Sequence, residues 1–181
     1  MDRLSEYLKE LNNKKWIVAN YDHPFVAGIG NGSLPINKFQ YYLRQDYVFL
    51  INYCRVLAIA ASKSSSEIMM KKWVSLLDET LNSEMDLHRN FCKDFGIHLS
   101  SLEKTEADTS TNNYCNFLIN NANKNSEKFI AISLLPCQWG YQEIAQNFVK
   151  NNFETNSFHK IWVDSYSSQE YKDVTNWLKN Y

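Results

Sequence analysis

The chain has 181 residues, which is the length of one domain and enough to bury a substantial core. Its formal net charge is -1 and its basic residues are scattered in ones and twos, which argues against binding to nucleic acid or to an anionic membrane surface. With only 5 Gly and 3 Pro, the composition excludes a loop-rich β architecture and favours helices.

The sequence also indicates a cellular compartment. No segment has the about 20 apolar residues of a membrane-spanning helix, and the N-terminus lacks the apolar stretch and small-residue cleavage site of a signal peptide. The 4 cysteines are far apart and form no Cys-x-x-Cys pair, which argues against a zinc site and against a disulfide scaffold. We therefore expect a cytoplasmic protein whose thiols are reduced. These thiols are Cys54, Cys92, Cys115 and Cys137.

Helical periodicity predicts an all-α bundle, formed by a single domain over residues 1–181. In chain order, the predicted helices cover residues 4–19, 35–62, 66–95, 109–123, 126–150, 157–164 and 168–179. Pro35 at the start of the second helix and Gly96 at the end of the third support these limits. Ser64 with Glu67, and Ser167 with Glu170, have the spacing of capping boxes. A polar stretch over residues 96–110 is the one long connection.

The helix predicted over 35–62 carries a carboxylate in the middle of an aromatic face. At helical spacing its stripe consists of Phe39, Tyr42, Asp46, Phe49, Tyr53 and Val56. A buried aspartate needs a partner, because removing its charge from water without compensation is costly. Arg55 or a lysine of another helix would serve as an internal partner. A flat, nitrogen-rich ligand with amino donors would serve equally well.

A proline, a cysteine and a tyrosine mark the helix predicted over 126–150. Pro136 removes a backbone donor and displaces the carbonyl of Ile132, which predicts a kink where Cys137 emerges. Cys137 and Tyr141 are four residues apart, so they should share a helix face. These residues alone leave two interpretations open. Cys137 is either a structural thiol beside an aromatic core residue or a nucleophile in a pocket.

Three segments of the chain together resemble the TenA family, known as thiaminase II or aminopyrimidine aminohydrolase, in its cysteine-containing branch. They are His23-Pro24-Phe25-Val26-x-Gly28-Ile29-x-x-Gly32-x-Leu34-Pro35, Gln45-Asp46-Tyr47 within the aromatic stripe, and Pro136-Cys137-x-Trp139-Gly140-Tyr141-x-Glu143-Ile144. The resemblance extends through residues 162–168 and so covers nearly the whole chain. It implies a heme-oxygenase-like all-α fold that holds no heme and usually assembles as a homotetramer.

The resemblance also implies a function. Members of this family release hydroxymethylpyrimidine from thiamin or from 4-amino-5-aminomethyl-2-methylpyrimidine, without a metal or another cofactor. By position, Cys137 corresponds to the family nucleophile and Asp46 to the carboxylate that binds the aminopyrimidine. The pocket positions of the family correspond to Phe49, Tyr114, Tyr141 and Tyr166, and at Phe49 the family commonly has tyrosine.

One departure from the family supports an alternative function. Family members continue beyond the position of Tyr181 with two more helices, one of which carries an acid/base glutamate, whereas this sequence ends first. The alternative is therefore a protein that binds the pyrimidine or thiamin but turns it over weakly or not at all. Either Glu143 or Glu84 would have to replace the missing acid, and neither matches its position.

A metal centre is a further alternative, because Glu84 and His88 lie at i and i+4 on one predicted helix. A carboxylate-bridged dimetal bundle needs a second set of Glu and His residues, which the remaining histidines do not offer. We therefore expect a local hydrogen bond between Glu84 and His88 and no metal. For the same reason we expect His23 to be structural and not an iron ligand.

Overall fold

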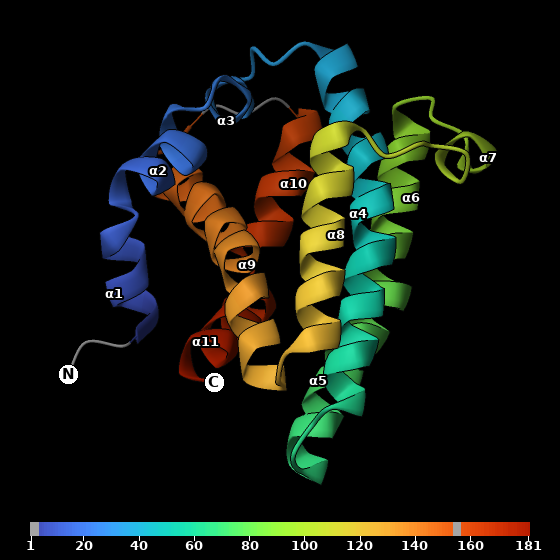
Figure 1. Cartoon of the computed structure of the whole chain (residues 1–181). Helices are drawn as coiled ribbons and strands as arrows, with labels where there is room; N and C mark the ends of the chain where they lie inside the picture. Colours follow the sequence, from blue (N-terminus) through green and yellow to red (C-terminus); the bar gives the residue numbers. More distant parts are fainter. Residues whose placement is uncertain (1–3, 154–156) are drawn as a thin grey trace. The chain divides into compact units, whose positions relative to one another are not determined.

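A computed structural model describes residues 4–153 and 157–181 (Figure 1). Every regular element in these residues is helical, so the all-α prediction is confirmed. The elements are α1 (Leu4–Leu11), α2 (Asn13–Ile17), η1 (Val18–Asp22), α3 (Pro24–Gly30), α4 (Ile36–Ser62), α5 (Glu67–Glu79), η2 (Thr80–Glu84), α6 (Met85–Asp94), α7 (Leu99–Leu102), α8 (Thr109–Lys124), α9 (Glu127–Lys150), α10 (Ser157–Ser167) and α11 (Gln169–Asn180). None of the described helices is long and apolar enough to cross a membrane.

The chain divides into two compact units. The first takes in the chain up to Pro35 and from Leu134 onward, and the second is Ile36–Ser133. The boundary at Leu134 falls within α9, two residues before Pro136. The single domain expected over residues 1–181 stays a prediction.

The second unit is built on α4, which contacts α5, α6 and α8 (Figure 1). The stripe read from the sequence is the buried side of this helix, because Phe39 and Val56 are fully buried and Tyr53 nearly so. Trp73 of α5 is also fully buried. Asp108 caps α8 by accepting a hydrogen bond from the backbone N–H of Thr111 at 2.6 Å.

The helix predicted over 66–95 is interrupted by the π-helical turn η2, so α5 and α6 replace one continuous helix. A π turn inserts an extra residue, and since each residue of an α-helix advances by about 100°, the faces of α6 are rotated relative to those of α5. Gly96 ends α6 as predicted, with a φ of 70° and a hydrogen bond from the N–H of Ile97 to the carbonyl of Cys92 at 2.8 Å.

Both predicted capping boxes are wrong in register. The side chain that caps α5 is Ser66, which accepts from the N–H of Met69 at 3.3 Å, while Ser64 binds the carbonyl of Ala60. Ser168 caps α11 by accepting from the N–H of Tyr171 at 3.2 Å, in place of Ser167. Runs of consecutive serines leave the cap position undetermined in the sequence, because each serine has the same capping chemistry.

Side chains of α4 hold the long polar connection between α6 and α8. Arg44 donates to the Ser101 hydroxyl at 2.6 Å, and the Gln45 side-chain amide donates to the Glu106 carbonyl at 3.1 Å. The side-chain carbonyl of Gln45 accepts from the N–H of Asp108 at 2.9 Å. The two Gln45 contacts satisfy backbone polar groups of the connection, and the Arg44 contact fixes a side chain within it. Within it lies the short helix α7, which the sequence analysis does not predict.

In the first unit, the His23–Pro35 segment builds α3 and the turn that follows it. His23 Nδ1 accepts from the N–H of Phe25 at 3.2 Å and caps α3, so the structural role expected for His23 is confirmed. Gly28 lies so close to Leu34 that an added Cβ would be 3.0 Å from the Leu34 Cβ. Gly32 has a φ of 71°, which glycine adopts without strain.

The helix predicted over 4–19 is also divided. It consists of α1, α2 and the π-helical η1, with a turn at Asn12 whose side chain donates to the carbonyl of Leu8 at 2.9 Å. No residue of α1 is buried. Residues 1–3 of the N-terminal amphipathic pattern lie outside the described part of the chain.

Candidate active site

The predicted site residues form two groups, one in each unit. The first unit carries Cys137, Tyr141 and Tyr166, and the second carries Asp46, Phe49 and Tyr114. Within each group the side chains come from neighbouring positions on one helix and from a second helix that packs against it.

Cys137 and Tyr141 lie on α9, which continues through Pro136 as one helix. The Tyr141 ring contacts two rings of α10, with centroid distances of 5.6 Å to Trp162 and 4.8 Å to Tyr166. Tyr166 in turn meets Tyr171 edge-on at 5.0 Å. Tyr141 and Tyr166 are therefore in direct contact, and Trp162 is the buried member of this aromatic cluster. Their role in a substrate pocket stays a prediction.

Cys137 differs from the other thiols in its surroundings. It is partly exposed, whereas Cys54, Cys92 and Cys115 are buried. Burial raises the pKa of Cys54 to about 11 and that of Cys92 to about 12, and it raises the pKa of Cys115 as well. These three groups stay protonated at neutral pH and are poor nucleophiles. Among the four thiols, Cys137 is the one that is partly exposed.

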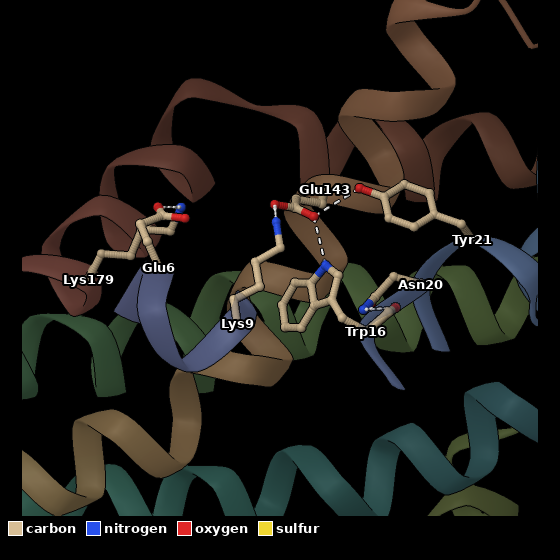
Figure 2. Close-up of polar contacts among 7 residues, drawn as sticks. All are labelled: Glu6, Lys9, Trp16, Asn20, Tyr21, Glu143 and Lys179. Atoms are coloured by element: carbon tan, nitrogen blue, oxygen red, sulfur yellow. Dashed lines mark hydrogen bonds and ion pairs between the residues drawn. The ribbon is translucent and has the colours of Figure 1, made fainter. Parts of the chain in front are cut away.

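The opposite face of α9 contacts the N-terminal segment (Figure 2). The Trp139 ring lies 5.3 Å from the Trp16 ring, between centroids. Two ammonium groups lie over the Trp139 ring, with Lys9 Nζ at 4.5 Å and Lys179 Nζ at 3.4 Å from its centroid. Gly140 leaves room for Asn20, whose Oδ1 would be 2.6 Å from an added Cβ.

Figure 2 shows that the Glu143 carboxylate is held by three donors. It forms an ion pair with Lys9 and accepts hydrogen bonds at 2.9 Å from Trp16 Nε1 and from the Tyr21 hydroxyl. Burial alone would raise the pKa of Glu143, but these donors outweigh it and hold the pKa below its ordinary value. Glu143 therefore stays ionised and bound to these three donors. A carboxylate in this state has no proton to donate, so Glu143 is a poor candidate for the substitute acid considered from the sequence.

In the second unit, Phe49 and Tyr114 form a flat aromatic pair. Their rings are nearly parallel, with an interplanar angle of 8° and a centroid distance of 5.6 Å. Phe49 also stacks on Tyr53 at 5.8 Å. Asp46 precedes Phe49 by three residues on α4, so the carboxyl group and the Phe49 ring lie on one side of the helix.

The ionisable side chain that lies next to Asp46 is His88. Its Nε2 atom lies 3.6 Å from Asp46 Oδ2, and both side chains are buried. Arg55, one partner considered from the sequence, is exposed and donates to the Asn52 side chain at 2.7 Å. Helical spacing alone does not predict His88 as the neighbour of Asp46, because it does not say which other helix a face meets.

Burial sets the protonation of this group. It raises the pKa of Asp46 to about 8, with a further contribution from the nearby Glu84, while a hydrogen bond from Tyr42 acts in the opposite direction. Burial and the neighbouring Glu79 raise the pKa of Glu84 to about 7. Burial lowers the pKa of His88 to about 4. At neutral pH, Asp46 is therefore mostly protonated and His88 is neutral.

The local hydrogen bond expected between Glu84 and His88 is not formed. His88 Nδ1 instead lies 3.6 Å from Cys92 Sγ, one turn further along α6. Glu84 is the last residue of η2, so the two side chains do not follow the regular α-helical register assumed from the sequence. Across residues 4–153 and 157–181, no three His, Cys, Asp or Glu side chains gather as ligands of one metal ion.

Comparison with known proteins identifies the family. A model of the TENA/THI-4/PQQC family matches residues 11–181. The chain is 38% identical over 161 residues to the aminopyrimidine aminohydrolase of Halalkalibacterium halodurans, covering 88% of this chain and 72% of that protein. It is 32% identical over 180 residues to the aminopyrimidine aminohydrolase of Helicobacter pylori, covering 98% and 82%.

The fold is shared with solved structures of the same kind. The TenA homologue from P. horikoshii OT3 superimposes with a TM-score of 0.93 at 26% identity, covering 99% of this chain and 84% of that one. The all-α architecture is therefore that of the TenA proteins. The chain belongs to the TENA/THI-4/PQQC family.

Proposed function

We propose that this chain is an aminopyrimidine aminohydrolase, a hydrolase that acts on C–N bonds and releases hydroxymethylpyrimidine. Its substrates would be 4-amino-5-aminomethyl-2-methylpyrimidine, thiamin or both, in the salvage or degradation of thiamin. The observation that carries this proposal is the environment of Cys137. It is a partly exposed thiol in a segment typical of the family, and two relatives that share at least 32% of their aligned residues with this chain bear that enzyme name.

The reaction requires a nucleophile because the leaving amine is attached, through a methylene carbon, to an electron-poor ring that resists direct displacement by water. In the proposed reaction, the Cys137 thiolate forms a C–S bond with a ring carbon while a ring nitrogen takes up a proton. The electron-rich ring then expels the amine, which leaves as ammonia after taking up the proton that the Cys137 thiol has lost. Water adds to the methylene carbon and the C–S bond breaks. Substrate and water thus become hydroxymethylpyrimidine and ammonia.

Asp46 would bind the aminopyrimidine. A carboxyl group with a pKa of about 8 carries a proton at neutral pH, and it can transfer this proton to the ring nitrogen. The resulting carboxylate accepts hydrogen bonds from that N–H and from the exocyclic amino group. Phe49 and Tyr114 would provide stacking faces for the flat ring, and Tyr141 and Tyr166 would provide hydroxyl groups.

The alternative, a binding protein without turnover, is not favoured by the names of the relatives. The two functions are separated by incubating the purified chain with 4-amino-5-aminomethyl-2-methylpyrimidine and, in parallel, with thiamin. We expect hydroxymethylpyrimidine from at least one of them, accompanied by an equal amount of ammonia in the first case. Tight binding of the pyrimidine with no product from either compound would contradict the hydrolase and support the binding protein.

A further inference from the structure

His88 has no role in the reaction described above, although it contacts the carboxyl group proposed to bind the substrate. Its Nε2 atom lies 3.6 Å from Asp46 Oδ2, with only 7% of the His88 side chain and 9% of the Asp46 side chain exposed. Its Nδ1 atom lies 3.6 Å from Cys92 Sγ. Asp46, His88 and Cys92 therefore form a buried polar row that leads from α4 into α6.

The chemistry of this row favours one tautomer of His88. The Cys92 thiol keeps its proton because burial raises its pKa to about 12, so its S–H can donate to His88 Nδ1. An accepting Nδ1 leaves the single hydrogen of the neutral imidazole on Nε2, the nitrogen that faces Asp46. His88 is neutral near pH 7 because burial lowers its pKa to about 4, although a hydrogen bond with the Leu43 backbone acts in the opposite direction.

The π turn η2 contributes to this arrangement. It lies directly before α6 and is held by Thr80, a buried residue whose hydroxyl donates to the Leu76 carbonyl at 2.8 Å. The extra residue of a π turn rotates the following helix by about 100° relative to an uninterrupted one, and π turns are frequent at functional sites. The face of α6 that carries His88 and Cys92 is thereby turned toward α4.

We propose that His88 is a positioning residue for substrate binding: its Nε2–H donates to Asp46 Oδ2, so that Asp46 Oδ1 is presented to the aminopyrimidine. This inference rests on the proposed function. When the proton of Asp46 passes to the ring nitrogen, the Nε2–H donor stabilises the carboxylate that forms, through a charge-assisted hydrogen bond. At 3.6 Å the contact is longer than a hydrogen bond, and the buried Nε2 atom has no hydrogen-bond partner of normal geometry in the described part of the chain. The proposed donation therefore requires this distance to shorten when the substrate binds.

Other ionisable groups of the same unit also act on Asp46 and enter any pH profile. They are Tyr42 on α4, Glu84 on η2, and His88 and Cys92 on α6. Two cations also act on the row, Arg44 on Cys92 and Arg89 on His88. Among these groups, His88 places a ring nitrogen 3.6 Å from Asp46 Oδ2. Replacing His88 therefore removes the proposed Nε2–H donor to Asp46.

Two substitutions separate the donor from the ring that carries it. His88→Phe keeps a flat ring and removes the donor, whereas His88→Gln places an amide N–H near the position of Nε2. The measurements are the affinity for hydroxymethylpyrimidine by calorimetry, and kcat and KM for the aminomethylpyrimidine, on both sides of pH 8, the pKa of Asp46. Melting temperatures report the stability of each variant.

We expect His88→Phe to weaken the binding of hydroxymethylpyrimidine by about tenfold to a hundredfold, the range for losing a hydrogen bond to a charged group. The pH above which binding is lost should also rise, because without the Nε2–H donor the Asp46 carboxylate is less stable and keeps its proton longer. His88→Gln should retain affinity within a few-fold of the wild type.

His159→Phe is the matched control. His159 is a buried histidine, 2% exposed, in α10 of the other unit, and burial lowers its pKa as well. The substitution should lower the melting temperature as much as His88→Phe does, and leave the affinity and its pH profile unchanged. A merely structural role of His88 would give the same result at both positions.

The inference is overturned if His88→Phe binds hydroxymethylpyrimidine with the affinity and pH profile of the wild type. It is also overturned if His88→Gln loses as much affinity as His88→Phe while both melt like the wild type. These results are distinct from failure of the proposed function. A wild-type chain that binds the pyrimidine but releases no ammonia contradicts the hydrolase alone, and one that binds no aminopyrimidine contradicts both.

Discussion

The Asp46 carboxyl group is buried without a cation beside it, and this has consequences for stability as well as for binding. Its ionised form is disfavoured by burial and by Glu84, so the folded protein holds a proton there at neutral pH. A substrate that brings N–H donors reverses this preference, because the carboxylate then gains charge-assisted hydrogen bonds. We therefore expect Asp46 to become ionised when the proposed ligand binds.

This protonation predicts a pH-dependent stability of the ligand-free protein. The pKa of Asp46 is about 8 in the folded chain against an ordinary 3.8, so the folded state binds the extra proton between these values. The contribution to stability is present below pH 3.8 and is lost as the pH rises to about 8. Glu84 acts in the same direction, with a pKa of about 7. His88, whose pKa is lowered, opposes them only below pH 6.5.

We therefore expect the melting temperature of the wild type to fall between pH 6.5 and pH 8, and to fall less steeply in Asp46→Asn. The amide has no proton to lose over this range. The control is Asp86→Asn, which removes a carboxylate from an exposed ion pair with Arg89 and should keep the wild-type slope. Equal slopes in Asp46→Asn and the wild type would show that Asp46 is ionised in the folded protein.

At the scale of elements, α9 combines two functions on opposite faces. Trp139 and Glu143, four residues apart, contact the N-terminal segment, while Tyr141 contacts the aromatic cluster of α10. Cys137, four residues before Tyr141, lies on the same side of the helix as Tyr141. Positions 137 and 139 differ by about 200° around the helix axis, so the two pairs point in nearly opposite directions. The segment from Pro136 to Ile144 therefore combines the contact with the N-terminal segment and the residues that we propose for catalysis.

Glu143→Gln tests this division of α9. Losing the charge that pairs with Lys9 in a partly buried site should lower the free energy of unfolding by about 1 to 3 kcal/mol. Turnover should stay within a few-fold of the wild type, because Glu143 serves the docking face. Glu67→Gln, which breaks an exposed ion pair with Lys71, should cost at most about 1 kcal/mol and serves as the control. A loss of turnover by about 10²- to 10⁴-fold in Glu143→Gln would instead identify a general acid.

Gly30→Ala tests the packing of α3 against α9. An added Cβ would lie 2.7 Å from Cε1 of the buried Phe148 ring, closer than such contacts allow. Overpacking of this kind should lower the free energy of unfolding by about 1 to 3 kcal/mol, measured by denaturant titration. Phe148→Leu makes room, so the double variant should lose less than the two single losses together. Strict additivity would show that the two residues do not meet.

Part of this structure follows from the sequence. The limits of α4, α8 and α9 agree with the predicted helices within one or two residues, because apolar periodicity and flanking residues such as Pro35 act locally. The turn at Asn12 and the π turn η2 were missed, since the helical pattern continues on both sides of each. The spacing of Cys137 and Tyr141 indicated a shared face, but the approach of His88 to Asp46 depends on the register of two helices.

At the scale of the whole molecule, assembly into a homotetramer and a cytoplasmic location stay predictions. The tetramer is tested by light scattering coupled to size-exclusion chromatography. We expect a mass four times that of the chain, which is 21.2 kDa. A single species with the mass of one chain, at concentrations well above those used in the assay, would contradict the tetramer.

Cys137→Ser tests the proposed role of Cys137 as the nucleophile of an aminopyrimidine hydrolase. A serine hydroxyl stays almost wholly protonated at neutral pH, so turnover should fall by about 10³-fold or more while hydroxymethylpyrimidine still binds. Cys115→Ala, which removes a buried thiol, should cost only packing energy of about 1 kcal/mol and keep turnover. Ammonia release from the aminomethylpyrimidine is the measurement. A loss of only a few-fold in Cys137→Ser would contradict the nucleophilic role of Cys137.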